Sequence, residues 1–168
     1  MLKKPTVLLI LVLAGTWLAY TFITGLIPDE TQITWLVEGM QEDFNNGAAT
    51  GVGKGLSADF EEEAYGLDKR GLVLGLMHAM RQERASDGTF PLRAEIRDTH
   101  QITVHQTDPR TADVTVLVEF TRLRRGASQD APPKALGLLQ FDGKCRYENG
   151  SWRFVSSTHE VLEGRRPF

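Results

Sequence analysis

The stretch QFDGKCRYENGSWRFVSSTH, residues 140–159, predicts a β-hairpin and decides the fold class. Asn149-Gly150 is the residue pair most typical of a two-residue hairpin turn. If residues are paired outward from this turn, one face of the hairpin receives the mainly apolar and aromatic pairs: Tyr147 with Trp152, Cys145 with Phe154, Gly143 with Ser156, and Phe141 with Thr158. The other face receives the polar set: Glu148 with Ser151, Arg146 with Arg153, Asp142 with Ser157, and Gln140 with His159. Turn chemistry and polarity agree on one register.

Two further strands are expected before this hairpin, because apolar residues alternate along the chain from Pro91 onward. The alternating positions are Leu92, Ala94, Ile96, Ile102 and Val104, then Ala112, Val114, Val116, Val118 and Phe120. Residues 107–110 are expected to connect the two strands. Residues 126–134 are expected to form a loop, since Pro132 and Pro133 cannot donate ladder hydrogen bonds. The chain therefore ends in an antiparallel meander of about four strands.

The residues before the meander have helical periodicity. Asp29 and Gln32 have capping-box spacing at the start of a helix that Asn45-Asn46-Gly47 ends. Asp68 is placed to cap a later helix that runs to about Arg84. Helices followed by antiparallel strands indicate the α+β class, with the helices packed on one face of a curved sheet.

The segment between these helices is predicted to be irregular. The glycine-rich run around residues 51–55 lacks the spacing of either a P-loop or a dinucleotide-binding fingerprint, so a flexible connector is expected there. Residues 56–60 are interpreted as a short helix or turn, and Glu61-Glu62-Glu63 as a solvated acidic turn.

The N-terminus is predicted to be a membrane anchor or signal. Residues 5–27 carry no charge, and as a helix they would extend about 34 Å, enough to cross a hydrocarbon core of about 30 Å. Lys3 and Lys4 before this span predict a single-pass protein with a cytoplasmic N-terminus and a periplasmic or extracellular domain. Cleavage after Ala14 is the alternative. The expected division is an anchor or signal, residues 1–28, and one soluble domain, residues 29–168.

Composition excludes some functions of that domain. Its 17 basic and 22 acidic side chains give a net charge of −5, which does not favour a nucleic-acid partner. Cys145 is the only cysteine, so no intramolecular disulfide can form. His100 and His105 have opposite strand parity and no acidic or thiol cluster lies beside them, so no metal is expected. No cofactor is expected either.

Taken in order, these features resemble the nuclear transport factor 2-like superfamily, the cystatin-like cone fold that includes ketosteroid isomerases and SnoaL-like cyclases. The resemblance covers roughly residues 30–162. It rests on the first helix, residues 56–60, the helix after Asp68, the strand Thr111-Ala112-Asp113-Val114-Thr115-Val116, and the closing Asn149-Gly150-Ser151-Trp152-Arg153-Phe154. It implies a pocket between the concave sheet and the helices, but the fold alone does not supply a function.

The preferred function is a non-catalytic binding or assembly module. Its expected pocket is lined by aromatic and hydroxyl side chains, although the aromatic ones are equally suited to a plain core: Tyr65, Phe120, Phe141, Tyr147, Trp152, Phe154, Ser156 and Thr158. The alternative is an isomerase- or cyclase-type enzyme in which Asp98 and His100, on the parity of the apolar residues, act as an acid–base pair. A bulge around residues 97–101 would instead turn both to solvent.

Partners are predicted from the same patterns. Residues 5–27 would contact a lipid bilayer. Arg146 lies opposite Arg153 in the predicted hairpin, where like charges repel unless an acid offsets them. Glu119 is one candidate, and an acidic protein partner at the outer sheet face is the other. The resemblance also implies a homodimer through that outer face.

Overall fold

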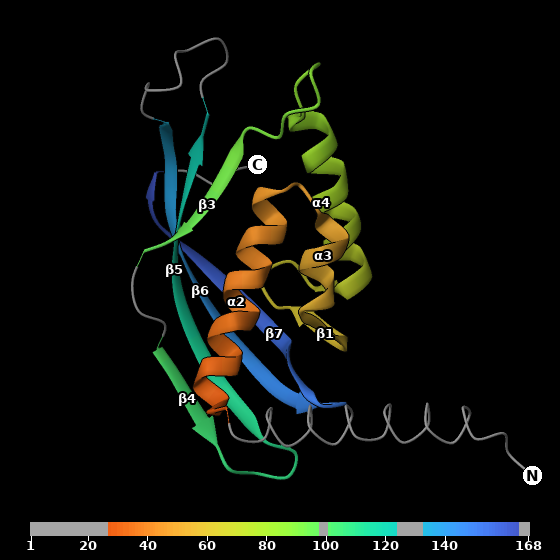
Figure 1. Ribbon diagram of the computed structural model, residues 1–168, viewed down its shortest axis with the longest axis vertical. Helices are drawn as coiled ribbons and strands as arrows, with labels where there is room; N and C mark the ends of the chain where they lie inside the picture. Colours follow the sequence, from red (N-terminus) through yellow and green to blue (C-terminus); the bar gives the residue numbers. More distant parts are fainter. Residues whose placement is uncertain (1–26, 98–100, 124–132, 165–168) are drawn as a thin grey trace, which may run out of the picture.

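The computed structural model describes residues 27–97, 101–123 and 133–164. In this part of the chain, helices cover one face of a curved sheet (Figure 1). The helices are α2 (Asp29–Asn45), α3 (Ala49–Lys54) and α4 (Lys69–Glu83). The α+β class and the packing of helices on one sheet face are confirmed, and so are the two long helices.

The sheet has seven strands rather than about four. They are β1 (Leu56–Glu62), β2 (Leu67–Asp68), β3 (Leu92–Ile96), β4 (Gln101–His105), β5 (Thr111–Arg122), β6 (Lys134–Glu148) and β7 (Ser151–Gly164). The strand order is β2-β1-β7-β6-β5-β3, and β4 also pairs with β5. All pairs are antiparallel except β1 with β7, which is parallel.

The predicted hairpin register is confirmed near the turn and wrong beyond it. Asn149 and Gly150 adopt positive φ angles, and Tyr147 pairs with Trp152 and Cys145 with Phe154, as expected. The register then shifts by one residue, so that Lys144 pairs with Ser156 and Phe141 with His159. A β-bulge at Val155 accounts for the shift, because one extra residue on β7 moves every later side chain to the other face.

The segment predicted as one long strand before β5 is divided into β3 and β4. Ile96 pairs with Val118, and Gln101 pairs with Thr115. Between these two pairs the chain advances five residues from Ile96 to Gln101, whereas β5 advances only three, so the first segment contains two extra residues. Ile96 and Ile102 still pack against the same core cluster. β3 ends at Ile96 and β4 begins at Gln101. A bulge around residues 97–101 is the alternative prediction for this region.

Two predicted local structures are corrected. Residues 56–60, expected as a helix or turn, belong to β1, because the long edge of β7 offers backbone partners that outweigh their modest β-propensity. The expected glycine-rich connector contains α3. Asp68 does cap α4, accepting a hydrogen bond from the Gly71 amide at 2.7 Å.

The predicted capping box at Asp29 does not form. Pro28 is the N-cap of α2, and the Asp29 carboxylate instead accepts hydrogen bonds from Arg110, at 2.7 and 2.8 Å, and from the Trp152 indole, at 3.2 Å. The Arg110 guanidinium also lies 4.1 Å from the centroid of the Tyr147 ring. Asp29 therefore ties the start of α2 to the sheet rather than closing its own helix.

The core between helices and sheet consists of two apolar clusters. The first contains Phe44 edge-on to Phe90 and Phe120, with α4 contributing Met80. The second surrounds Ile33, Cys145 and Trp152. Burial raises the pKa of the Cys145 thiol to about 12, so this cysteine stays protonated as a small core residue.

The membrane prediction is not supported. No helix in the described part of the chain is long and apolar enough to cross a membrane. The segment on which the prediction rested, residues 5–27, lies outside the described residues except for Ile27. The predicted single-pass localisation, with a cytoplasmic N-terminus and a periplasmic or extracellular domain, is contradicted by this finding and is dropped.

Gly143 is predicted to be intolerant of substitution. A Cβ atom at this position would lie 2.7 Å from the Phe154 ring and 3.2 Å from the Ser156 carbonyl oxygen. We expect Gly143→Ala to lower the free energy of unfolding by about 1–3 kcal/mol, as overpacking does, measured by urea denaturation. Gly75 on α4 is the matched control, since nothing lies within 4 Å of its added Cβ, and Gly75→Ala should stabilise by up to about 1 kcal/mol. Equal tolerance at both positions would contradict the predicted overlap.

Candidate functional site

A carboxylate and an imidazole are buried together where β1 lies beside β7. Glu62 on β1 and His159 on β7 approach within 3.2 Å, from Oε1 to Nδ1. Their side chains are only 6% and 11% exposed. The Glu62 Oε2 atom also accepts a hydrogen bond from the Tyr65 amide at 2.8 Å. Burial of two ionisable groups is costly unless they are paired. The His159 ring and the Tyr65 amide together satisfy both carboxylate oxygens of Glu62.

The contact orients the imidazole. When Nδ1 carries the proton, it donates to Glu62 and leaves Nε2 able to accept a proton from another molecule. When both nitrogens are protonated, Glu62 balances the charge of the ring. A base oriented by a second group in this way is the usual arrangement of a proton-transferring site.

Aromatic rings flank this pair. The Tyr65 ring centroid lies 5.4 Å from that of His159, with the rings 40° apart, and the Phe141 centroid lies 5.7 Å away at 33°. Phe120 continues the series 6.4 Å from Phe141. Tyr65 is 52% exposed, so this series of rings leads from the surface toward the first core cluster. The surroundings of the buried pair are therefore mainly aromatic.

The bulge in β7 places His159 at this site. In the predicted register His159 opposed Gln140 on the polar face, whereas in the structure it pairs with Phe141 and packs against its ring. The adjacent apolar residues Phe154 and Val155, which break the alternation, are the sequence signal for this bulge. Sequence reasoning also missed Glu62, because residues 61–63 are interpreted there as a solvated turn, whereas Glu62 belongs to β1 and pairs with β7.

The predicted pocket residues divide into separate groups. Tyr65 and Phe141 lie beside His159, and Phe120 contacts Phe141 from within the first core cluster. Tyr147, Trp152 and Phe154 belong to the second core cluster. Ser156 and Thr158 pair with Lys144 and Asp142. They therefore lie on the outer face, opposite the side predicted for them.

The predicted acid–base pair cannot be placed. Asp98 and His100 lie outside the described residues. Within the described ranges, no group of three or more His, Cys, Asp or Glu side chains is arranged to hold a metal ion.

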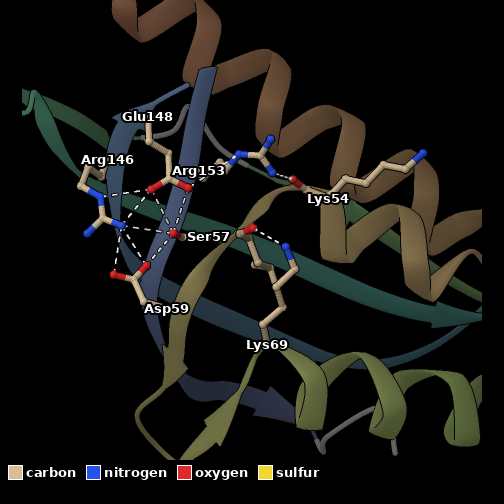
Figure 2. Close-up of polar contacts among 8 residues, drawn as sticks. Lys54, Ser57, Asp59, Lys69, Arg146, Glu148 and Arg153 are labelled. Carbon is tan, nitrogen blue, oxygen red and sulfur yellow. Dashed lines mark hydrogen bonds and ion pairs between the residues drawn. The ribbon is translucent and has the colours of Figure 1, made fainter. Parts of the chain in front are cut away.

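The two facing arginines belong to a polar network between β1 and the β6–β7 hairpin, which we call the Arg146 network: Ser57, Asp59, Arg146, Glu148 and Arg153 (Figure 2). Arg146 Nη2 lies 2.8 Å from both Asp59 Oδ1 and Glu148 Oε2. The buried Ser57 hydroxyl lies 2.5 Å from Asp59 Oδ1 and 2.9 Å from Glu148 Oε1.

Arg146 and Arg153 do oppose one another, as predicted. Glu148 offsets their repulsion, lying 3.8 Å from the Arg153 Nε atom, and Arg153 also donates to the Lys54 carbonyl at 2.7 Å. Glu119, the predicted counter-charge, pairs with Arg97 instead. An acidic protein partner and a homodimer at the outer face stay predictions.

The Arg146 network predicts an acid-sensitive contribution to stability. Hydrogen bonds from Arg146, the larger cause, and from Ser57 lower the pKa of the Asp59 carboxyl to about 2. Because the unfolded chain takes up this proton near pH 4, the contribution is full above about pH 4 and is lost as the pH falls through about 2. We expect the difference in urea midpoint between wild type and Asp59→Asn to shrink across this window. A difference independent of pH would contradict this assignment.

The fold is found in solved structures of other proteins. One is a nuclear transport factor 2-like protein with a cystatin-like fold from Novosphingobium aromaticivorans, with a TM-score of 0.62 and 14% identity, covering 82% of this chain and 84% of that one. A putative scytalone dehydratase from the same organism has a TM-score of 0.60 and 14% identity, covering 84% and 89%. Aln2 from a Streptomyces species has a TM-score of 0.61 and 15% identity, covering 78% and 88%.

Sequence comparison adds no relative to these structures. No protein-family model matches the chain, and none of the curated proteins matches it. At identities of 14–15%, the structural likeness establishes the fold and leaves the activity open. The chain has the cystatin-like cone fold of nuclear transport factor 2-like proteins.

Proposed function

We propose that this domain binds a small, flat, mainly apolar molecule and transfers protons to and from it through Glu62 and His159. The observation that carries the proposal is the buried contact between these side chains, at 3.2 Å, with aromatic rings on both sides. A structural ion pair needs no such ring series leading to it from the surface. This pair replaces Asp98 and His100 as the acid–base candidates.

The chemistry suited to this pair is proton abstraction next to a carbonyl, followed by loss of a β-hydroxyl group. One member takes the proton from the α-carbon, and the other donates a proton to the departing hydroxyl, which leaves as water while a C=C bond forms. Charge developing on the carbonyl oxygen would need a hydrogen-bond donor, and the hydroxyl of Tyr65, whose ring lies beside that of His159, is a candidate. The likeness to a putative scytalone dehydratase supports this reaction class by analogy of fold.

The proposal is tested with 3-hydroxy-1-tetralone, a flat hydroxy ketone whose dehydration gives fluorescent 1-naphthol. Full-length protein in D₂O should accelerate two events: deuterium incorporation at C2, followed by mass spectrometry, and release of 1-naphthol. Exchange reports proton abstraction even where the hydroxyl does not leave. A rate of exchange equal to that of buffer, at substrate concentrations that saturate binding, would overturn the proposal.

Binding without chemistry is the second candidate. It is favoured by the exposure of Tyr65, 52%, beside a His159 side chain that is only 11% exposed, since a ligand could stack on the Tyr65 ring without reaching the imidazole. The same experiment separates the two functions. Saturable binding of the tetralone without deuterium exchange supports a binding module, whereas exchange supports the acid–base site.

A further inference from the structure

A second candidate site lies on the helical layer, away from Glu62 and His159. A pocket of about 260 Å³ opens between the turn that joins α2 to α3 and the C-terminal half of α4. Figure 1 shows these two segments side by side. Ala48 and Thr50 line one side, Met77 and Met80 line the other, and Arg81 and Arg84 complete the lining. Met80 is 2% exposed, so the bottom of the pocket is apolar.

The two guanidinium groups are not neutralised within the described part of the chain. Neither Arg81 nor Arg84 forms an ion pair there, whereas Arg97, Arg110, Arg122, Arg146 and Arg153 each do. Glu83, which lies between them in sequence, binds Arg122 through both carboxylate oxygens, at 2.6 and 2.9 Å. Two like charges close together at the C-terminal end of α4 repel, so an anion between them would be stabilised.

One of these groups is held in place. Arg84 Nη1 donates to the Gly88 carbonyl oxygen at 2.8 Å. A Cβ atom added to Gly47 would lie 2.8 Å from Arg84 Nη2, so the guanidinium rests directly against the Gly47 backbone. Gly47 has a φ of +66°, which also favours glycine. A fixed guanidinium loses less entropy on binding an anion than a freely moving one does.

We propose that this pocket binds a small organic anion, with its carboxylate against Arg81 and Arg84 and its apolar part against Met77 and Met80. At about 30 Å³ for each water-sized volume, the pocket has room for roughly nine non-hydrogen atoms, the size of benzoate. The favourable interaction of cations with the C-terminal end of a helix would explain why two arginines occur at this end of α4. It does not explain why they line an apolar hollow.

The methionines allow a direct test. Full-length protein labelled with [¹³C-methyl]methionine is titrated with benzoate and followed by NMR, with signals assigned from single Met→Leu variants. We expect saturable shifts of the Met77 and Met80 methyl signals that are larger than any shift of Met40, which packs against the same core cluster but does not line the pocket. Benzamide, which has the same shape without the charge, should bind at least tenfold more weakly.

Variants of individual arginines test whether benzoate binding depends on the charges in this pocket or on the overall positive charge of the protein. Arg81→Gln/Arg84→Gln should weaken benzoate binding at least tenfold, while Arg70→Gln, an exposed arginine elsewhere on α4, should leave it unchanged. Circular dichroism checks that each variant is folded, and the benzamide comparison decides the question if the double variant is not. The proposal is overturned if benzoate causes no saturable shift, if benzamide binds equally, or if the double variant binds like wild type.

Discussion

Glu62→Gln should reduce deuterium exchange and dehydration of 3-hydroxy-1-tetralone by a factor of about 10²–10⁴, the usual contribution of a positioned acid or base. The amide is close in shape to the carboxylate, and its oxygen can still accept the hydrogen bond that the Tyr65 amide gives to Glu62. It cannot take up a proton or balance a charged imidazole. His159→Gln should cause a comparable loss, because the imidazole that exchanges protons with the substrate is removed.

The chain offers a matched control for this pair. His105 and Asp113 also form a histidine–carboxylate contact, at 2.8 Å, but their side chains are 44% and 58% exposed. His105→Gln removes an imidazole with the same chemistry from a solvated position and should leave turnover unchanged. If His105→Gln lowers turnover as much as His159→Gln does, the catalytic role belongs elsewhere. If Glu62→Gln binds the tetralone and turns it over normally, Glu62 is structural.

The sequence predicts the fold best where local chemistry and side-chain polarity coincide. Asn149-Gly150 and the flanking alternation predict the first pairs of the β6–β7 hairpin, from Glu148–Ser151 to Cys145–Phe154, because turn type and apolar face both specify them. Beyond Phe154 the polar run Ser156-Ser157-Thr158 fits either face, so polarity no longer determines the register. The bulge at Val155 then depends on tertiary packing, and it lies next to the close approach of the Phe154 ring to Gly143.

The candidate site could not be predicted for the same physical reason. Glu62 is buried only because β1 pairs in parallel with β7, a contact between segments almost a hundred residues apart that no local pattern encodes. His159 faces inward only because of the bulge. Tyr65, Phe120 and Phe141 are predicted as pocket candidates from their aromatic type, and Phe120 and Phe141 also from their strand parity. Their chemical partners follow from long-range pairing alone.

Trp152→Ala should have the largest effect on stability, lowering the free energy of unfolding by about 3–5 kcal/mol. The indole is 3% exposed, packs in the second core cluster with Ile33 and Cys145, and lies edge-on to Tyr147 with ring centroids 5.6 Å apart. Its Nε1 atom donates to Asp29 at 3.2 Å. The substitution therefore creates a cavity at the point where α2 meets the sheet and removes a hydrogen bond to a mainly buried carboxylate.

Chemical denaturation of two further variants separates these contributions. Trp152→Phe keeps most of the ring and loses the N–H group, so it should cost about 1–3 kcal/mol, the range for leaving a buried acceptor short of one donor. Trp35→Ala removes the same side chain from α2 where it is 56% exposed, and it should change stability by no more than about 0.5 kcal/mol. A similar small loss in Trp152→Ala would mean that α2 is held to the sheet by the Asp29–Arg110 ion pair rather than by indole burial. Asp29→Asn would then become the more damaging substitution.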